Sequence, residues 1–377
     1  MGRRSRRREL IRVRRSKRPR HPPVARHPEI RHPRQSPASG RCLRQDNGSR
    51  PLQAEGDRGD TQRRRIRGSH PRDLRGGHRR PRVPRLHRPG TDPHQEGSHP
   101  FDGRKRPVWY VFSGMGSQWP GMLGALMEIE TFKRTISKLA ETLGCEDFDL
   151  MTVLNSESDE TFDDVLNSFV SITAVQIALV DVLTSVGISP DGMIGHSIGE
   201  LGCAYVDETL TAEQTILAAF WRGRAIAESD VPRGSMAAVG LSWEDASECV
   251  PLDIFPSCEN SPNSVTVSGP PASISNFIND LRSRGVFAKE VLSSGMAFHS
   301  KYITAAGPYL QKSLEKIISK PKQRTSRWVS TSVPKSEWNT PLAQTSSAAY
   351  HVNNLLNPVL FKARVLMKLI FSLSSYF

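Results

Sequence analysis

The sequence predicts an α/β fold: a parallel-sheet core of the hydrolase type, with a nucleophile elbow and a small inserted α+β subdomain. Three observations predict it. The sequence GHSIGE at 195–200 stands between a short apolar strand and a helix. Apolar strand candidates alternate with helical patterns on both sides of it. Residues 235–292 follow the order β-α-β-β-α-β, which is the ferredoxin-like arrangement.

The first 104 residues differ in composition from the rest of the chain. Residues 1–106 hold 32 of the 52 Lys and Arg residues but 10 of the 38 acidic ones, and no aromatic residue precedes Phe101. Their apolar residues follow no period, so we expect residues 1–104 to be disordered. Their bias without any motif favours sequence foreign to the native protein over a solvated tail or a basic arm. Because no aromatic residues are interleaved with the basic ones, no nucleic-acid partner is expected. Salt-dependent DNA binding by residues 1–100 alone would identify a nucleic-acid-binding arm.

The five cysteines show no C-x-x-C spacing, so neither a disulfide framework nor a metal site is expected. Reduced thiols and the lack of an apolar leader at the Arg-rich start predict a cytoplasmic protein. Residues 365–377 form the longest apolar stretch near the end and are too short to span a bilayer, so no membrane association is expected.

The region from 105 to 234 contains the first half of the core. A strand over 108–112 leads into a glycine-containing turn at 113–119, which is the position of a second oxyanion donor in elbow enzymes. Amphipathic helices are predicted over 131–142 and 171–186, the second ending at Gly187.

The elbow explains why Ser197 is the candidate nucleophile. A strand over 192–194 and a helix over 199–205 flank a turn in which only small residues avoid the neighbouring backbone. The turn lifts the hydroxyl of Ser197 to the N-terminus of the helix, where backbone N–H groups face a developing oxyanion. The alternative for this motif alone is a glycine-rich turn with an idle serine.

A helix over 211–228, capped by Thr211, places Arg222 among apolar neighbours. An arginine in such a setting either extends to solvent or to an acidic partner, or it binds a substrate carboxylate with its planar fork.

Residues 235–292 form the inserted subdomain, with strands over 235–241, 254–258, 264–268 and 286–292 and helices over 242–250 and 271–284. The core resumes from 293 to 377. There we expect helices over 303–318 and 346–356 and a strand over 327–332. Beyond the basic segment only His196, His299 and His351 are available as a base. Adjacent side chains diverge at a sharp turn and His351 lies on a helix, so His299, in a loop, is the candidate.

Together these motifs resemble the malonyl/acetyl-CoA acyltransferase domain, in the version found in animal-type multifunctional fatty acid synthase. The resemblance covers about residues 105–362, and the motifs that carry it occur in the family's order: 113–118, 195–200, 221–223, 297–300 and 353–359. It implies a ping-pong reaction in which an acyl group passes from a CoA thioester to a seryl ester. The phosphopantetheine thiol of acyl carrier protein then accepts it, with no bound cofactor or metal. It also implies that the other domains of a fatty acid synthase are partners.

The resemblance implies a role for eight positions. Ser197 matches the nucleophile and His299 the general base and acid. Asn354 matches the residue whose backbone carbonyl orients that histidine. The remaining matches are the oxyanion-hole N–H groups, the residue that pairs with the malonyl carboxylate, and the apolar lining of the acyl pocket: Met115 and Ile198, Arg222, Phe298 and Phe169.

Two departures and two alternatives remain. Nothing in 1–100 resembles the region that precedes this domain in the synthase, and 365–377 does not match the helix, strand and closing helix that follow it, so we expect a C-terminally truncated core. The same domain in a polyketide synthase is one alternative. A serine esterase or thioesterase is the other, and it requires an acidic partner for His299 from one of five carboxylates: Asp207, Asp230, Asp245, Asp253 and Asp280.

Overall fold

The computed structural model describes residues 106–362. The chain divides into two units, Met1–Gln95 and Glu96–Phe377, and all described residues belong to the second. The expectations for residues 1–104 and for 365–377 therefore lie outside the described residues.

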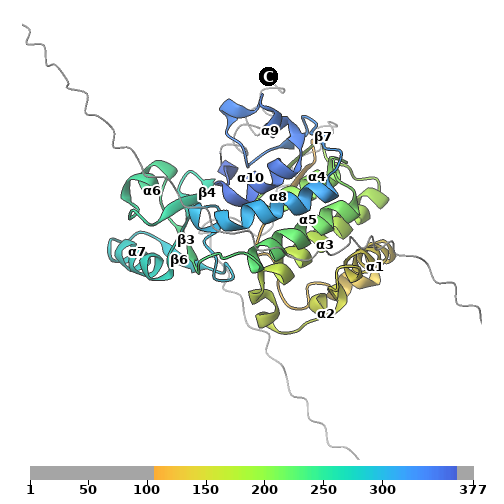
Figure 1. Ribbon diagram of the computed structural model, residues 1–377, viewed down its shortest axis with the longest axis horizontal. Coiled ribbons are helices and arrows are strands. Elements are labelled where there is room, and N and C mark those ends of the chain that lie inside the picture. The colour runs from red at the N-terminus through yellow and green to blue at the C-terminus, as the bar shows by residue number, and fades with distance from the viewer. Residues whose placement is uncertain (1–105, 363–377) are drawn as a thin grey trace, which may run out of the picture. The chain divides into compact units, whose positions relative to one another are not determined.

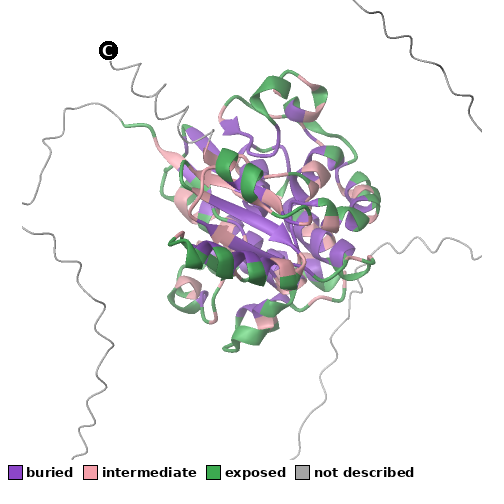
Figure 2. Cartoon of the chain, turned by 90° about the vertical axis from the view of Figure 1, so that its left-hand side faces the viewer, coloured by how far each residue is buried: buried purple, intermediate pink, exposed green. Residues whose placement is uncertain are grey.

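A three-stranded parallel sheet lies at the centre of the larger part of the fold (Figure 1). Its order is β1 (Trp109–Phe112), β2 (Gly192–Gly195) and β8 (Trp328–Val329), and both strand pairs are parallel. Every residue of the middle strand, β2, is buried, and Figure 2 shows the purple strands enclosed by helices. The predicted first two strands are confirmed, whereas the strand expected over 327–332 is only two residues long.

Helices pack around this sheet, and the predicted ones are present. The α-helices outside the small subdomain are α1 (Glu130–Gly144), α2 (Leu150–Leu154), α3 (Val165–Ser185), α4 (Glu200–Val206), α5 (Ala212–Ala227), α8 (Gly307–Ile317), α9 (Pro341–Gln344) and α10 (Ala348–Leu356). Short 3₁₀ turns connect them: η1 (Gly124–Glu128), η2 (Asp159–Asp163), η3 (Ser197–Gly199), η4 (Lys301–Ala306) and η5 (Lys335–Glu337). A two-stranded ribbon pairs β7 (Lys322–Gln323) with β9 (Thr345–Ser346).

Local signals explain where several of these helices begin. Thr211 caps α5 in a capping box with Gln214. The helix expected over 303–318 is divided into η4 and α8, because Pro308 occupies the first turn of α8, where its missing N–H removes no hydrogen bond.

Helix α3 differs from its prediction. Asp164 caps it by accepting hydrogen bonds from the N–H groups of Leu166 and Asn167, so it begins six residues before the expected start. Its first ten residues are mostly buried on all sides, which removes the one-sided pattern of an amphipathic helix. By length and composition α3 could cross a membrane, but 61% of its most apolar window is buried inside the fold, as in the core helix of a folded domain.

The inserted subdomain has the predicted topology. Strands and helices follow in the order β3 (Ser235–Val239), α6 (Trp243–Cys249), β4 (Phe255–Ser261), β5 (Ser264–Gly269), α7 (Pro271–Ser283) and β6 (Ala288–Val291). The antiparallel sheet has the order β4-β5-β3-β6, which confirms the ferredoxin-like arrangement. A separate apolar cluster fills the space between its sheet and its two helices.

A short segment after α10 joins this subdomain to the core. Val359 forms a parallel bridge with Cys258 of β4. Its N–H donates to the carbonyl of Ser257 at 2.9 Å, and its own carbonyl accepts from the N–H of Glu259 at 2.8 Å. The loop that ends α10 is therefore held by both parts of the fold.

Candidate active site

The elbow places Ser197 between β2 and α4. Its backbone has a φ of 53°, a left-handed conformation that is uncommon for a residue with a side chain. A Cβ on Gly195 would lie 2.5 Å from the N of Glu200, so the turn tolerates no side chain there. This strained turn is the strand-to-helix geometry predicted from the motif.

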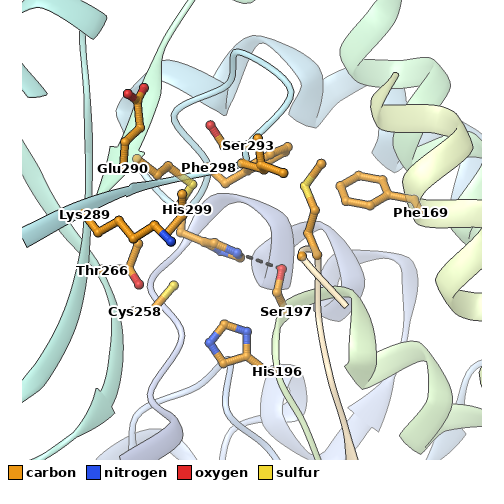
Figure 3. Close-up of a pocket in the computed structure, with 15 residues that line it drawn as sticks. Phe169, His196, Ser197, Cys258, Thr266, Lys289, Glu290, Ser293, Phe298 and His299 are labelled. Atoms are coloured by element: carbon orange, nitrogen blue, oxygen red, sulfur yellow. Dashed lines mark hydrogen bonds between the residues drawn. The ribbon is translucent and has the colours of Figure 1, made fainter. Parts of the chain in front are cut away.

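Ser197 and His299 form a dyad (Figure 3). The hydroxyl of Ser197 lies 2.8 Å from Nε2 of His299, across 102 residues of sequence. On the other side of the ring, Nδ1 lies 2.9 Å from the carbonyl oxygen of Asn357. Because a carbonyl only accepts, Nδ1 carries the proton and Nε2 is free to accept the proton of Ser197.

A second carbonyl joins that of Asn354, the residue expected to orient the base. The hydrogen bond of Nδ1 goes to the carbonyl of Asn357, three residues beyond Asn354, whose own carbonyl has a smaller influence on the ring. Asn357 precedes Pro358, which holds it extended (φ −104°, ψ 162°). Helix α10 therefore ends at Leu356, one residue before Asn357, and the carbonyl of Asn357 is turned toward the imidazole of His299.

Burial keeps His299 neutral. The side chain is 3% exposed, and burial, with the charges of Arg222 and His196 adding to it, lowers the pKa of His299 to about 3. The carbonyl hydrogen bonds act in the opposite direction. At neutral pH the imidazole is thus unprotonated, as a base for the serine proton must be.

Arg222 reaches the same serine from α5. Its Nη2 donates to the hydroxyl of Ser197 at 3.2 Å, and its Nη1 donates to Oδ1 of Asn354. Its guanidinium lies 5.2 Å from the ring centre of Phe169. Burial lowers the pKa of Arg222 to about 9, so it still carries its charge at neutral pH.

A cavity of about 410 Å³ opens onto the dyad. Its apolar wall includes Phe169 and Phe298, whose ring centres are 5.8 Å apart, as expected for an acyl pocket. Cys258 and Thr266 of the small subdomain line the opposite side (Figure 3). Arg222 lies beside the nucleophile and is not a lining residue of this cavity.

The two expected oxyanion donors are near the nucleophile. Met115 lines the cavity, and Ile198 directly follows Ser197 at the start of η3. Donation by their N–H groups to a reacting oxygen stays a prediction.

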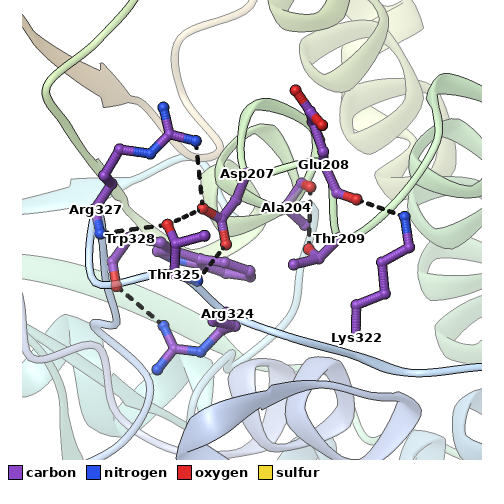
Figure 4. Close-up of polar contacts among 9 residues, drawn as sticks. All are labelled: Ala204, Asp207, Glu208, Thr209, Lys322, Arg324, Thr325, Arg327 and Trp328. Atoms are coloured by element: carbon purple, nitrogen blue, oxygen red, sulfur yellow. Dashed lines mark hydrogen bonds and ion pairs between the residues drawn. The ribbon is translucent and has the colours of Figure 1, made fainter.

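The acidic partner of an esterase triad is not found where it would be needed, since a carbonyl holds Nδ1 of His299. Asp207 accepts from the N–H of Thr325 at 2.8 Å and pairs with Arg327 at 3.9 Å (Figure 4), which fastens the end of α4 to the segment before β8. Three other carboxylates have structural contacts, with the hydroxyl of the capping residue Ser242, with the hydroxyl of Ser273 and with Arg284 in a helix ion pair: Asp245, Asp253 and Asp280.

The sequence profile of the acyl transferase domain matches residues 109–371. This chain belongs to the acyl transferase domain family. Within residues 106–362, no group of three or more His, Cys, Asp or Glu side chains could hold a metal ion.

Much longer proteins contain a region similar to this acyl transferase domain. A highly reducing polyketide synthase of Neurospora crassa, srdA, is 34% identical over 287 residues, which are 72% of this chain and 12% of that protein. Another, from Leptosphaeria maculans, is 31% identical over 283 residues, covering 70% and 11%. The chain therefore spans about one eighth of the length of these relatives.

Solved structures share the fold. The acyltransferase domain of the polyketide synthase PpsC of Mycobacterium tuberculosis superposes with a TM-score of 0.58 and 26% identity, covering 68% of this chain and 77% of that one. The malonyl CoA-acyl carrier protein transacylase of Coxiella burnetii gives 0.61 at 20% identity, covering 70% and 84%.

Two residues of this acyl transferase domain, His196 and Glu200, make contacts near the site that sequence analysis did not predict. His196 lines the same cavity as the dyad, and its Nε2 lies 2.9 Å from Oδ1 of Asn260 in the small subdomain. Glu200, the last residue of the elbow motif, is fully buried. It accepts from the N–H of Thr331 at 2.5 Å and from the hydroxyl of Tyr350, which ties the elbow to β8 and α10. The contacts of Glu200 had one sign in the sequence, which is the position of an acidic residue directly after the elbow.

Acidification should destabilise the acyl transferase domain through its buried histidines. Burial lowers the pKa of His351 to about 3, as it does for His299. Below about pH 6.5 the unfolded chain binds these protons while the folded protein does not. The contribution of each neutral, buried histidine to the free energy of unfolding is fully present above pH 6.5. It is lost as the pH falls toward 3, at about 1.4 kcal/mol per pH unit.

The measurement is urea unfolding of the wild type and of His351→Gln between pH 7.5 and 5. The variant should show the shallower loss of free energy of unfolding, by the contribution of one histidine. Identical slopes in the two proteins would contradict the assignment of His351 as neutral and buried. The comparison cancels the titration of all other groups, which the two chains share.

Proposed function

We propose that this domain transfers malonyl groups from CoA to the phosphopantetheine thiol of an acyl carrier protein within a polyketide synthase. The observation that supports it best is the Ser197–His299 dyad at 2.8 Å with a buried guanidinium 3.2 Å from the same hydroxyl. The relatives named above, both polyketide synthases, favour this assembly over a fatty acid synthase.

The chemistry follows from the positions of the groups. Nε2 of His299 takes the proton of Ser197 as the oxygen attacks the thioester carbonyl, and then delivers it to the departing CoA thiolate. The second half repeats these steps with the carrier thiol as nucleophile, so that Ser197 leaves with the proton. Between the two halves, the cation of Arg222 binds the free carboxylate of the malonyl group.

The catalytic assignment is tested by incubating the protein with labelled malonyl-CoA and acetyl-CoA. A polyketide-type domain is expected to form the malonyl ester much faster than the acetyl ester. Comparable rates for the two would favour the acyltransferase of a fatty acid synthase. Covalent labelling without transfer to any carrier protein, followed by release to water, would favour an esterase.

Arg222→Ala should selectively impair malonyl transfer. Without the cation that binds the malonyl carboxylate, kcat/KM for malonyl-CoA should fall by about 10²–10³-fold. The kcat/KM for acetyl-CoA should change little, because acetyl has no carboxylate. Arg222→Lys should lie in between, because an ammonium keeps the charge but not the fork. Steady-state transfer assays with both thioesters check this, and an equal loss for both substrates would disprove the carboxylate contact.

A further inference from the structure

The side chain of Asn354 makes contacts that its expected role does not require. It is 2% exposed, and its Oδ1 accepts a hydrogen bond from Nη1 of Arg222. Its Nδ2 donates to the hydroxyl of Ser332 at 2.8 Å. A flipped amide would turn an NH₂ group against the guanidinium, so the contacts select one orientation.

These contacts divide the guanidinium into two edges. Asn354 holds Nη1. On the other edge, Nη2 donates to Ser197, while Nε is buried and has no hydrogen-bond partner among residues 106–362. The Nε and Nη2 hydrogens of an arginine point the same way, as a fork that matches the two oxygens of a carboxylate. The N–H of Nε, on the edge next to the nucleophile, is therefore left without a partner.

The charge of Arg222 has no ion-pair partner, although the buried Glu200 acts on it from a greater distance. Within the described part of the chain, no carboxylate lies within ion-pair distance of it. A neutral amide can orient a guanidinium without neutralising it, which an aspartate at the same place could not do.

We propose that Asn354 is a positioning residue for substrate specificity. Its side chain holds Nη1 of Arg222, leaves Nε and Nη2 for the carboxylate of an acyl group on Ser197, and adds no negative charge beside the cation. This inference rests on the proposed function and adds to it the group that makes the site selective for dicarboxylic acyl groups.

Asn354→Asp is the sharpest test, because it keeps the shape and adds one charge. The new carboxylate pairs with Arg222, and the hydroxyl of Ser332 can rotate to donate to its second oxygen. We expect kcat/KM for malonyl-CoA to fall by about 100-fold, mainly through a higher KM, and that for acetyl-CoA to change by less than about threefold. A change at the backbone carbonyl or at His299 would impair both substrates alike.

Asn353→Asp is the matched control. Asn353 adjoins Asn354 on α10, and its Nδ2 donates to the carbonyl of Ser332 at 2.7 Å. It should keep the malonyl-to-acetyl ratio of the wild type. An equal fall for both substrates in Asn354→Asp, or an unchanged ratio, would overturn the inference while leaving the proposed function intact.

A binding measurement separates the inference from catalysis. Free malonate should raise the melting temperature of the wild type and of Asn353→Asp, and acetate should not. Asn354→Asp should lose the response to malonate. If it responds as the wild type does, the inference fails, whether or not the protein transfers acyl groups. If it loses the response while no form of the protein transfers acyl groups, the inference stands and the proposed function fails.

Discussion

Ser197→Ala is expected to lower acyl transfer by at least about 10³-fold and to abolish covalent labelling by malonyl-CoA. The oxygen of Ser197 meets both Nε2 of His299 and Nη2 of Arg222. Without it the thioester has no nucleophile, although the cavity and its cation remain. Intact-protein mass spectrometry after incubation with malonyl-CoA measures the ester directly.

Ser171→Ala provides the control for removing a buried hydroxyl. Its oxygen is buried on α3 and has no hydrogen-bond partner among the described residues. This variant should therefore label as the wild type does and be no less stable. Malonyl ester persisting on Ser197→Ala, at any other residue, would contradict the assignment of the nucleophile.

Gly199→Ala is expected to destabilise the folded protein by about 3 kcal/mol. A Cβ at this position would meet the backbone of the β1 end, at the carbonyl oxygen of Phe112 and 2.8 Å from that of Ser113. Backbone cannot swing aside as a long side chain can, so either the elbow or β1 must shift. Urea unfolding measures the loss, and labelling by malonyl-CoA should fall with it because the same turn carries Ser197.

Gly144→Ala is the comparison for this prediction. Gly144 ends α1, and a Cβ there meets nothing within 4 Å. Alanine favours a helix over glycine, so this variant should be as stable as the wild type or slightly more stable. Equal unfolding midpoints for the two alanine variants would show that the elbow is not sterically constrained.

The catalytic residues could be predicted because each belongs to a short local pattern. Ser197 is specified by a strand, a turn of small residues and a helix. His299 follows by elimination, since only three histidines lie beyond residue 106. The structure brings both to the same cavity, with Arg222 at the serine. Their positions depend on sheet and helix order, which the alternation of elements predicts.

The corrections concern properties that depend on tertiary contacts. Which carbonyls face His299 depends on where α10 ends, and the carbonyl of Asn357 lies 2.9 Å from Nδ1 while that of Asn354 has a smaller influence. An Asn-Pro pair was the only local sign of it. Burial of α3 on all sides depends on the helices packed around it, and β8 is short because Thr331 already bonds to Glu200 and to the carbonyl of Gly195.

The segment after α10 also sets where this domain can be recombined with others. Val359 is fixed to β4 by two hydrogen bonds, and Lys362 pairs with Glu259 at 3.0 Å. The carbonyl that aligns the base lies only two residues before Val359. A chimera joined directly after α10 would lose the bonds between Val359 and β4, and so would one whose foreign small subdomain cannot pair with Val359. In both, we expect the imidazole of His299 to be misaligned. Splice sites placed after residue 362 keep that alignment with the transplanted unit.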